Sequence, residues 1–529
     1  MFSTFARVGT GLAAMVLAAT TFALAETSAT PAQNVIAQAT PAPKATPKPF
    51  AYRGYVRAYD FSRQNASSYN KPGTANQQSF AAALSLHGQY TWFNSLTVGG
   101  SYLYSNPFNG CAQPRTHLSQ TTPPGICSNK ANPAPSLQQD DTLPGYSLNT
   151  LYEAYLQYQD KSLYAKVGDQ VVNTPWTNPS DSRLKPEAFQ GVDASYKLNP
   201  NWTVEGSYYN AWEERVSSNF FHDTLLTGQY VDGSGLSTLY NINTKSSATN
   251  PQSITNKGVW FGRVGYADKN FTSNIDYYGF DNIANAEWFD GKYQLKGKIK
   301  PYVALQIGNE KSTGTDLVGI IDSQIYGIQG GVNVTPNILV TLGYDHIPSK
   351  TATITLPAGG VCPANHVLAA GKGLADYFLG TGGTPNCVPG PAVGGLNTAT
   401  VYYGGWASPY TDSYATDVLF TTSISQGMID RRSFGDSGKL AATYTSDNKK
   451  FVLLVARALY AYGNNAVGVS PTQETNIDGQ YFFNPVPKTG PYKGFMVRYR
   501  YAERTINNTT IYGGTPLFKY NRAQFEYDF

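Results

Sequence analysis

The stretches FMVRYRY (495–501) and AQFEYDF (523–529) alternate apolar with polar side chains, the second one up to the last residue of the chain. Period-two alternation is typical of a β-strand with one apolar face. A soluble sandwich would turn that face inward, whereas a transmembrane barrel turns it to lipid and leaves the charged face on water. An aromatic last strand ending at Phe529 also resembles the assembly signal of outer-membrane barrels. We therefore predict an all-β fold, a transmembrane antiparallel β-barrel.

The first 49 residues precede the predicted barrel in two parts. Residues 1–25 combine Arg7, an apolar run over 11–20 and Ala-Leu-Ala at 23–25, the pattern of a secretory signal peptide. Residues 26–49 are rich in Ala, Thr and Pro, which predicts a flexible linker. No later segment reaches about 18 consecutive apolar residues, which argues against a transmembrane helix. We expect one barrel over residues 50–529, with long extracellular loops.

The composition fits a protein of the outer membrane. Charged residues make up 14% of the chain, below the roughly 25% of typical soluble domains, and aromatic residues reach 13% with 39 Tyr. Tyr and Trp suit the two water–lipid boundaries, where the ring rests in the interface and the polar atom faces headgroups. An aromatic-rich extracellular sandwich is the alternative, but it leaves the C-terminal strand unexplained. A net charge of +4 is too mild to indicate nucleic-acid binding.

Alternating runs recur from residue 50 to the end, for example at 96–102, 152–158, 202–208 and 338–344. In the second of these, Tyr152 is expected on the same face as Tyr158. A spanning strand needs about 10 residues, and connections raise the average to about 25–30 residues per strand, which gives about 16–18 strands. A barrel of that size keeps an aqueous interior. The composition predicts long loops near 105–145, 217–257, 350–415 and 462–490 and a short turn at 197–200.

All four cysteines fall in segments rich in Pro, Gly or Asn: Cys111, Cys127, Cys362 and Cys387. An even count in an exported protein predicts two loop disulfides. Local pairing, 111 with 127 and 362 with 387, is the preferred one of three possible connectivities. A metal site at Cys362, His366 and Cys387 would lack a fourth ligand and any CxxC spacing, so no metal and no other cofactor is predicted.

Residues 164–191, YAKVGDQVVNTPWTNPSDSRLKPEAFQG, resemble a stretch of the OprD family of substrate-selective porins. The matching positions are Lys166, Gly168, Thr174, Pro175, Ser182, Arg183, Leu184, Pro186 and Gly191. The C-terminal pair of strands resembles the family again. The resemblance implies an 18-stranded barrel that takes up small, often carboxylate-bearing solutes. It also implies a lumen lined by a ladder of Arg and Lys side chains.

The alternation offers candidates for such a ladder. A guanidinium binds a carboxylate bidentately and stays charged, and several weak sites in a row allow transit. The candidates on the first and last strands, which are neighbours in a closed barrel, are Arg53, Arg57, Arg498, Arg500 and Arg522. The alternative is that they pair with Glu503, Glu526 and Asp528 for structure. Arg183 and Lys185 are candidates at a constriction, and the alternative there is a turn stabilised by an Arg and Pro186.

The sequence thus favours a selective outer-membrane porin of a Gram-negative type envelope that works by passive diffusion without catalysis. The expected partners are outer-membrane lipids, the barrel assembly machinery and small solutes, with the barrel a monomer or a trimer. A general diffusion porin, an adhesin or structural barrel, and an outer-membrane hydrolase remain alternatives. For the hydrolase, the five His residues are isolated, and neither G-x-S-x-G nor H-E-x-x-H occurs.

Overall fold

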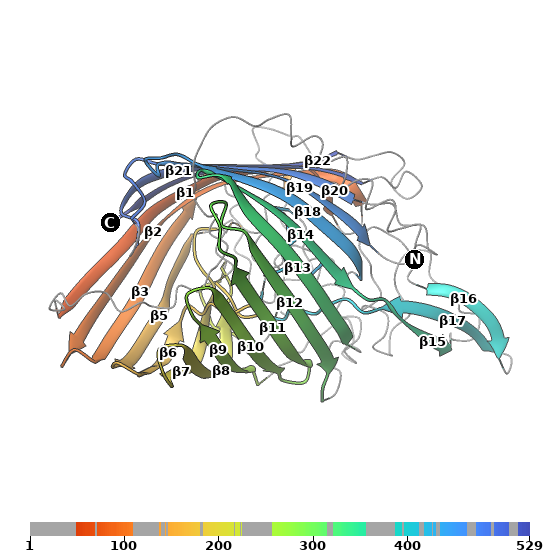
Figure 1. Cartoon of the computed structure of the whole chain (residues 1–529), viewed down its shortest axis with the longest axis horizontal. Coiled ribbons are helices and arrows are strands. Elements are labelled where there is room, and N and C mark those ends of the chain that lie inside the picture. The colour runs from red at the N-terminus through yellow and green to blue at the C-terminus, as the bar shows by residue number, and fades with distance from the viewer. Residues whose placement is uncertain are drawn as a thin grey trace.

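The computed structural model describes residues 49–68, 71–108, 137–138, 143, 147–179, 183–215, 217–222, 224, 257–314, 321–355, 387–393, 396–411, 417–425, 427–429, 434–462, 472–487, 491–506 and 517–529. Within these ranges, eighteen antiparallel strands form a closed barrel, which confirms the predicted fold class (Figure 1). The barrel strands are β1 (Phe50–Ser68), β2 (Lys71–Trp92), β3 (Leu96–Pro107), β5 (Leu148–Gln159), β6 (Leu163–Gln170), β7 (Ala188–Lys197), β8 (Trp202–Glu213), β9 (Val259–Ala267), β10 (Phe271–Phe280), β11 (Ala284–Gln294), β12 (Tyr302–Ser312), β13 (Asp322–Thr335), β14 (Ile338–Ile347), β18 (Gly435–Thr445), β19 (Phe451–Tyr462), β20 (Thr472–Phe482), β21 (Gly494–Ile506) and β22 (Leu517–Asp528).

Four further strands lie outside the ring. β4 (Leu137–Gln138) pairs in parallel with β2, and β15 (Lys350–Thr355), β16 (Cys387–Val393) and β17 (Leu396–Tyr403) form a separate antiparallel sheet. Figure 1 shows this small sheet beside the barrel, beyond the end of β14. No helix among the described residues is long and apolar enough to cross a membrane.

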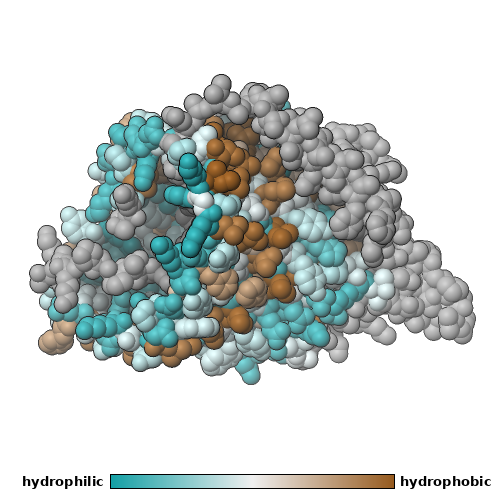
Figure 2. Space-filling model, viewed as in Figure 1, coloured by the Kyte–Doolittle hydropathy of each residue, from teal (hydrophilic) through white to brown (hydrophobic). Residues whose placement is uncertain are grey.

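The two faces of the C-terminal strands follow the alternation in the sequence. Tyr499, Phe525 and Tyr527 are 47%, 44% and 49% exposed on the outer wall. Arg500 and Arg522, in alternate positions, are 9% and 1% exposed and point inward. Apolar side chains gather on the wall that faces the viewer in Figure 2. The wall is therefore apolar outside and polar inside, the arrangement that a barrel in lipid requires.

One predicted face was wrong. Tyr152 is buried on the inner side, where its hydroxyl lies 2.9 Å from that of Ser85, instead of sharing the outer face with Tyr158. The cause is a β-bulge: Ser101 pairs with Glu153 and the next residue of β3 pairs with Leu151, so Tyr152 has no counterpart. An extra residue on one strand reverses the alternation beyond it.

One end of the ring carries the long segments and also the short turn 281–283 between β10 and β11. The other end, where both termini of the barrel lie, carries short turns. Two of them are shaped by aspartates: Asp160 accepts backbone N–H groups of Leu163 and Ser162, and Asp268 accepts two in the same way, so the pKa of each carboxyl is held below its usual range. Three of the predicted long loops fall on long connections, but 462–490 does not, because β20 crosses it.

Aromatic side chains ring the outer wall near the short-turn end. The exposed members of this girdle are Trp92, Tyr158, Tyr196, Trp202, Tyr293 and Tyr481. Such a belt marks the boundary between hydrocarbon and water in transmembrane barrels. It indicates how deep the wall sits in lipid at this end.

The barrel closes where β1 pairs with β22, and the last residue completes the pairing. Gly54 and Phe529 exchange two backbone hydrogen bonds of 3.1 and 3.0 Å. A Cβ on Gly54 would come within 2.5 Å of the Ser85 carbonyl and 2.6 Å of the Phe529 ring. Only glycine lets that ring lie against the wall, as when an aromatic side chain covers a strand glycine.

We expect Gly54→Val to weaken barrel closure, because overpacking of this kind costs about 1–3 kcal/mol. The measurement is the temperature at which the purified barrel loses its folded, fast-migrating form on a denaturing gel. Gly88→Val is the matched control, since a Cβ at Gly88 of β2 meets no atom within 4 Å. Equal melting of the two variants would contradict the role assigned to Gly54.

Candidate functional site

Two connections enter the barrel and meet inside it. We call residues 171–179 and 183–187, between β6 and β7, the first inner segment. Residues 404–411 and 417–425, between β14 and β18, are the second inner segment. Thr177 and Tyr410 form a parallel bridge between them, and the rings of Trp176 and Trp406 lie 5.0 Å apart. The lumen is therefore narrowed by two segments in mutual contact.

The first inner segment is held against β1 and β8. The Arg57 guanidinium donates to the Arg183 carbonyl at 2.8 Å, and the Tyr55 hydroxyl donates to the Leu184 carbonyl at 2.8 Å. Lys185 is fully buried in an ion pair with Glu213, with 3.0 Å between Nζ and Oε1. Of the two residues predicted at a constriction, Lys185 therefore anchors the first inner segment to β8. A buried pair of this kind cannot lose one partner without a large cost.

The second inner segment is fastened to the wall by side chains that accept its backbone N–H groups. These side chains and the residues whose N–H groups they accept are Glu310 with Ala407 (2.8 Å), Asp345 with Thr421 (2.8 Å), Asn476 with Ile424 (3.0 Å) and Glu474 with Ser425 (3.0 Å). Asp345 and Glu474 also accept the hydroxyls of Thr421 and Ser425. Since a buried backbone N–H needs an acceptor, these wall groups let the segment lie in the lumen.

Three tryptophans pack where the two inner segments meet the wall. Trp288 of β11 contacts both Trp176 and Trp406, with ring centroids 5.0 and 5.9 Å away. Gly308 of β12 makes room, since a Cβ there would lie within 3.0 Å of both Trp288 and Trp406. All three indoles are fully buried, so this cluster is packing that holds the constriction.

A basic wall lines the lumen on both sides of the β1–β22 seam. Arg500 and Arg522 are direct partners in the register of β21 and β22. Phe61, the register partner of Arg522, packs its ring 4.8 Å from that of Tyr520. The guanidinium groups of Arg63 and Arg183 lie 4.9 and 5.4 Å from the Phe61 ring centroid. Arg183 comes from the first inner segment, so the structure brings this candidate to the same place as two of the strand candidates.

Other strand candidates are engaged in ion pairs. Arg57 makes a bidentate pair with Glu526, at 2.6 and 3.0 Å. Arg498 and Arg500 share the carboxylate of Asp478, at 2.6 and 2.8 Å. Arg53 faces His87 across β1 and β2 and is exposed.

Arg500 and Arg522 therefore lie together at the seam, and Arg57 has the structural pairing that was the alternative; a role of these residues in selectivity stays a prediction. Glu526 was among the partners expected for that pairing. The sequence interpretation missed Arg63, Tyr520 and Asp478. Arg63 and Tyr520 share the alternation of the candidates on their own strands, which is the signal that would have found them. Asp478 lies in a stretch that was taken for a loop.

An acidic wall lies across the lumen and was not predicted. Arg263 of β9 pairs bidentately with Asp276 of β10, at 2.7 Å for both contacts, and lies 3.8 Å from Glu205. Asp193 and Asp290 line neighbouring strands and accept from Ser207 and Asn274. β10 is the ninth strand of the ring when counting starts at β1, so these four carboxylates, with Arg263, Lys166 and Lys292 on the same inner wall, face the basic wall from about half a circumference away.

Several predicted positions lie outside the described residues: Ser182, Cys111, Cys127 and Cys362. Cys387 begins β16, and its side chain is not described. The two loop disulfides therefore stay a prediction.

No protein-family model and no curated protein sequence matches this chain. Among solved structures, OccAB3 of Acinetobacter baumannii is similar at a TM-score of 0.57 and 13% identity, over 91% of this chain and 99% of that one. A BenF-like porin from Pseudomonas fluorescens Pf-5 (0.58, 11%) and the outer membrane protein opdK from Pseudomonas aeruginosa (0.56, 11%) each cover 91% of this chain and 98% of their own. OprD-family porins are among these neighbours, so the resemblance seen at residues 164–191 is confirmed at the level of the fold.

We expect Asp345→Ala to loosen the second inner segment and raise single-channel conductance. The change leaves the Thr421 N–H and hydroxyl without their acceptor, a loss of about 1–3 kcal/mol. The control is Asp290→Ala, which removes a lumen carboxylate that contacts Asn274 of the wall and neither inner segment. If both variants conduct alike, the inner segment does not set the width of the pore.

Proposed function

We propose that this chain is an outer-membrane porin for passive, selective diffusion of small water-soluble solutes that carry a carboxylate. The supporting fold is a closed barrel narrowed by two inner segments. The observation that supports selectivity is the gathering of arginines at the seam: Arg500 and Arg522 are register partners, and Arg63 and Arg183 both lie over the ring of Phe61, which pairs with Arg522.

The arrangement of charges suits transit rather than tight capture. A carboxylate is attracted by the guanidinium groups at the seam and repelled by the carboxylates around Arg263, so the two walls push it in the same direction. Glu526 and Asp478 offset part of the positive charge at the basic wall. The remaining attraction is spread over several sites, and a solute can leave each of them.

A general diffusion porin would need a wide lumen, and the contact between Trp176 and Trp406 argues against that alternative. An adhesin or structural barrel would share the fold and conduct poorly. An outer-membrane hydrolase would need an accessible nucleophile with a base in reach. His87 Nδ1 lies 2.8 Å from Ser101 Oγ, but the Ser101 hydroxyl donates to Glu153 Oε2 at 2.6 Å and Ser101 is only 1% exposed, so this contact does not offer a nucleophile to a substrate. Conductance and hydrolysis of an ester probe separate these classes.

We propose further that residues 1–25 direct export and that the barrel assembly machinery inserts the chain through the last strand. Outer-membrane lipids would then surround the apolar wall, in a Gram-negative type envelope. The barrel would act as a monomer or a trimer, because each subunit has its own lumen.

The test is single-channel current of the refolded protein in a planar bilayer under a salt gradient. Discrete openings with anion preference are expected, together with block by small carboxylates. Openings without anion preference would leave a general diffusion porin. Silence of a demonstrably folded barrel would contradict the porin itself.

We expect the double variant Arg500→Gln, Arg522→Gln to lower the anion-to-cation permeability ratio by a factor of roughly 2–5 per charge, the effect of about 0.5–1 kcal/mol of screened attraction. The measurement is the shift in reversal potential. Arg457→Gln on β19 is the control, because Arg457 bonds Thr475 and Gln473 on the outer face and does not line the lumen. An equal shift in both variants would refute a role for the seam.

A further inference from the structure

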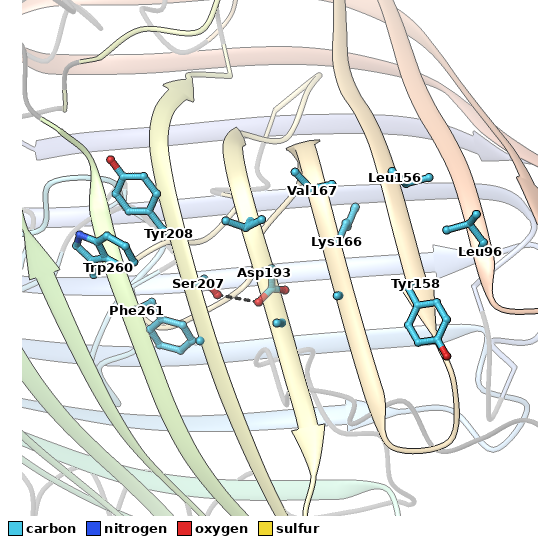
Figure 3. Close-up of a pocket in the computed structure, with 14 residues that line it drawn as sticks. Leu96, Leu156, Tyr158, Lys166, Val167, Asp193, Ser207, Tyr208, Trp260 and Phe261 are labelled. Carbon is cyan, nitrogen blue, oxygen red and sulfur yellow. Dashed lines mark hydrogen bonds between the residues drawn. The ribbon is translucent and has the colours of Figure 1, made fainter.

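The outer wall carries an apolar groove across β3 and β5–β9, with a volume of about 540 Å³. Its floor consists of the small residues Ala165, Ala194 and Gly206, and a Cβ on Gly206 would meet no atom within 4 Å. Large side chains stand on either side, with Tyr208 and Trp260 at one end and Leu96 and Tyr158 at the other (Figure 3). The floor is one sheet thick, since Asp193 and Ser207 of the lumen side also border it.

The sides of the groove are held in place. The Tyr208 and Trp260 rings stack at 4.2 Å, and the Tyr208 hydroxyl donates to the Lys257 carbonyl at 2.6 Å. At the other end the Tyr158 hydroxyl donates to Asp160 at 3.1 Å. The groove is thus formed before any occupant arrives, which lowers the cost of ordering on binding.

Lysines stand at the end of the groove near Tyr158. Lys161 and Lys269 lie in short turns below it, and Lys197 is the last residue of β7, at the start of another turn. All three are exposed, and no ion pair to them is seen among the described residues. The next turn adds Lys296, Lys298 and Lys300. The two carboxylates of these turns, Asp160 and Asp268, accept backbone N–H groups, so the four turns carry six positive and two negative charges, a net +4.

We propose that this groove binds an acyl chain of an anionic phospholipid, with the headgroup on Lys161, Lys197 and Lys269. An apolar groove that ends at the aromatic girdle and at a cluster of exposed lysines matches both parts of such a lipid. A second copy of the chain fits less well. Two barrels inserted in the same direction would bring identical lysine-bearing turns together at the same depth, and like charges repel. The inference rests on the proposed membrane location and concerns a site outside the pore.

The experiment measures lipid retained by the full-length protein in native mass spectrometry, after equal loading with phosphatidylglycerol and phosphatidylcholine of the same acyl chains. Wild type should keep more phosphatidylglycerol. Gly206→Leu fills the floor and should reduce retention of both lipids. Gly88→Leu is the matched control, because Gly88 also faces the outer wall with open space and lies outside the groove.

The variants Lys161→Gln, Lys197→Gln and Lys269→Gln should lower only the preference for phosphatidylglycerol, by roughly five-fold for each lysine. Equal retention of the two lipids by wild type, or equal behaviour of Gly206→Leu and Gly88→Leu, would overturn the site. If wild type instead shows the mass of a dimer, and Gly206→Leu loses that dimer while it keeps as much lipid as wild type, the groove binds a second copy of the chain and the lipid site is overturned. Conductance of the same preparations tests the proposed porin function independently of the lipid site. A barrel that conducts but shows no lipid preference refutes the lipid site alone. A barrel that does not conduct but retains phosphatidylglycerol refutes the porin function alone.

Discussion

Every structural feature of the barrel depends on pairing all main-chain polar groups of the wall without help from solvent. In lipid an unpaired N–H or C=O costs several kcal/mol, so a sheet in the membrane must close on itself. Closure happens at β1 and β22, where ten consecutive residue pairs run from Tyr55 to Gln64 and Gly54 bonds to Phe529 beyond them. This seam joins distant parts of the chain: Arg57 and Glu526, in ion-pair contact, are 469 positions apart. The basic wall exists because the barrel closes there.

Eighteen strands enclose more space than the side chains of the wall can fill. The two inner segments occupy that space, and their backbone needs partners just as the wall does. Asp345 and Glu474 supply them, since each accepts both an N–H and a hydroxyl from the second inner segment. The polar inner face of the wall, which can hydrogen-bond water, can therefore also hydrogen-bond the inner segments. Width and charge of the lumen are set by the same residues.

The sequence predicted features that depend on neighbouring residues and missed those that depend on register. Period-two alternation placed Arg500 inside and Tyr499 outside, because the direction of a strand side chain is a local property. Tyr152 was misplaced because a bulge is defined by two strands together. β20 was taken for a loop because its inner face carries Glu474, Asn476 and Asp478, which give a strand the composition of a loop. The opposition of the basic and acidic walls needed the full ring, which no single segment contains.

The distribution of positive and negative side chains differs along the seam. Where Arg57 meets Glu526, charges of opposite sign are matched and the pair mainly supports the wall. Where Arg500 meets Arg522 in register, with Arg63 and Arg183 both over the Phe61 ring, several positively charged side chains lie together. Like charges held together by the fold are stabilised by any anion that comes between them. The acidic wall on the far side increases the field at that point. In the proposed function, an anion is attracted to this part of the lumen and leaves it again because Asp478 already supplies part of that stabilisation.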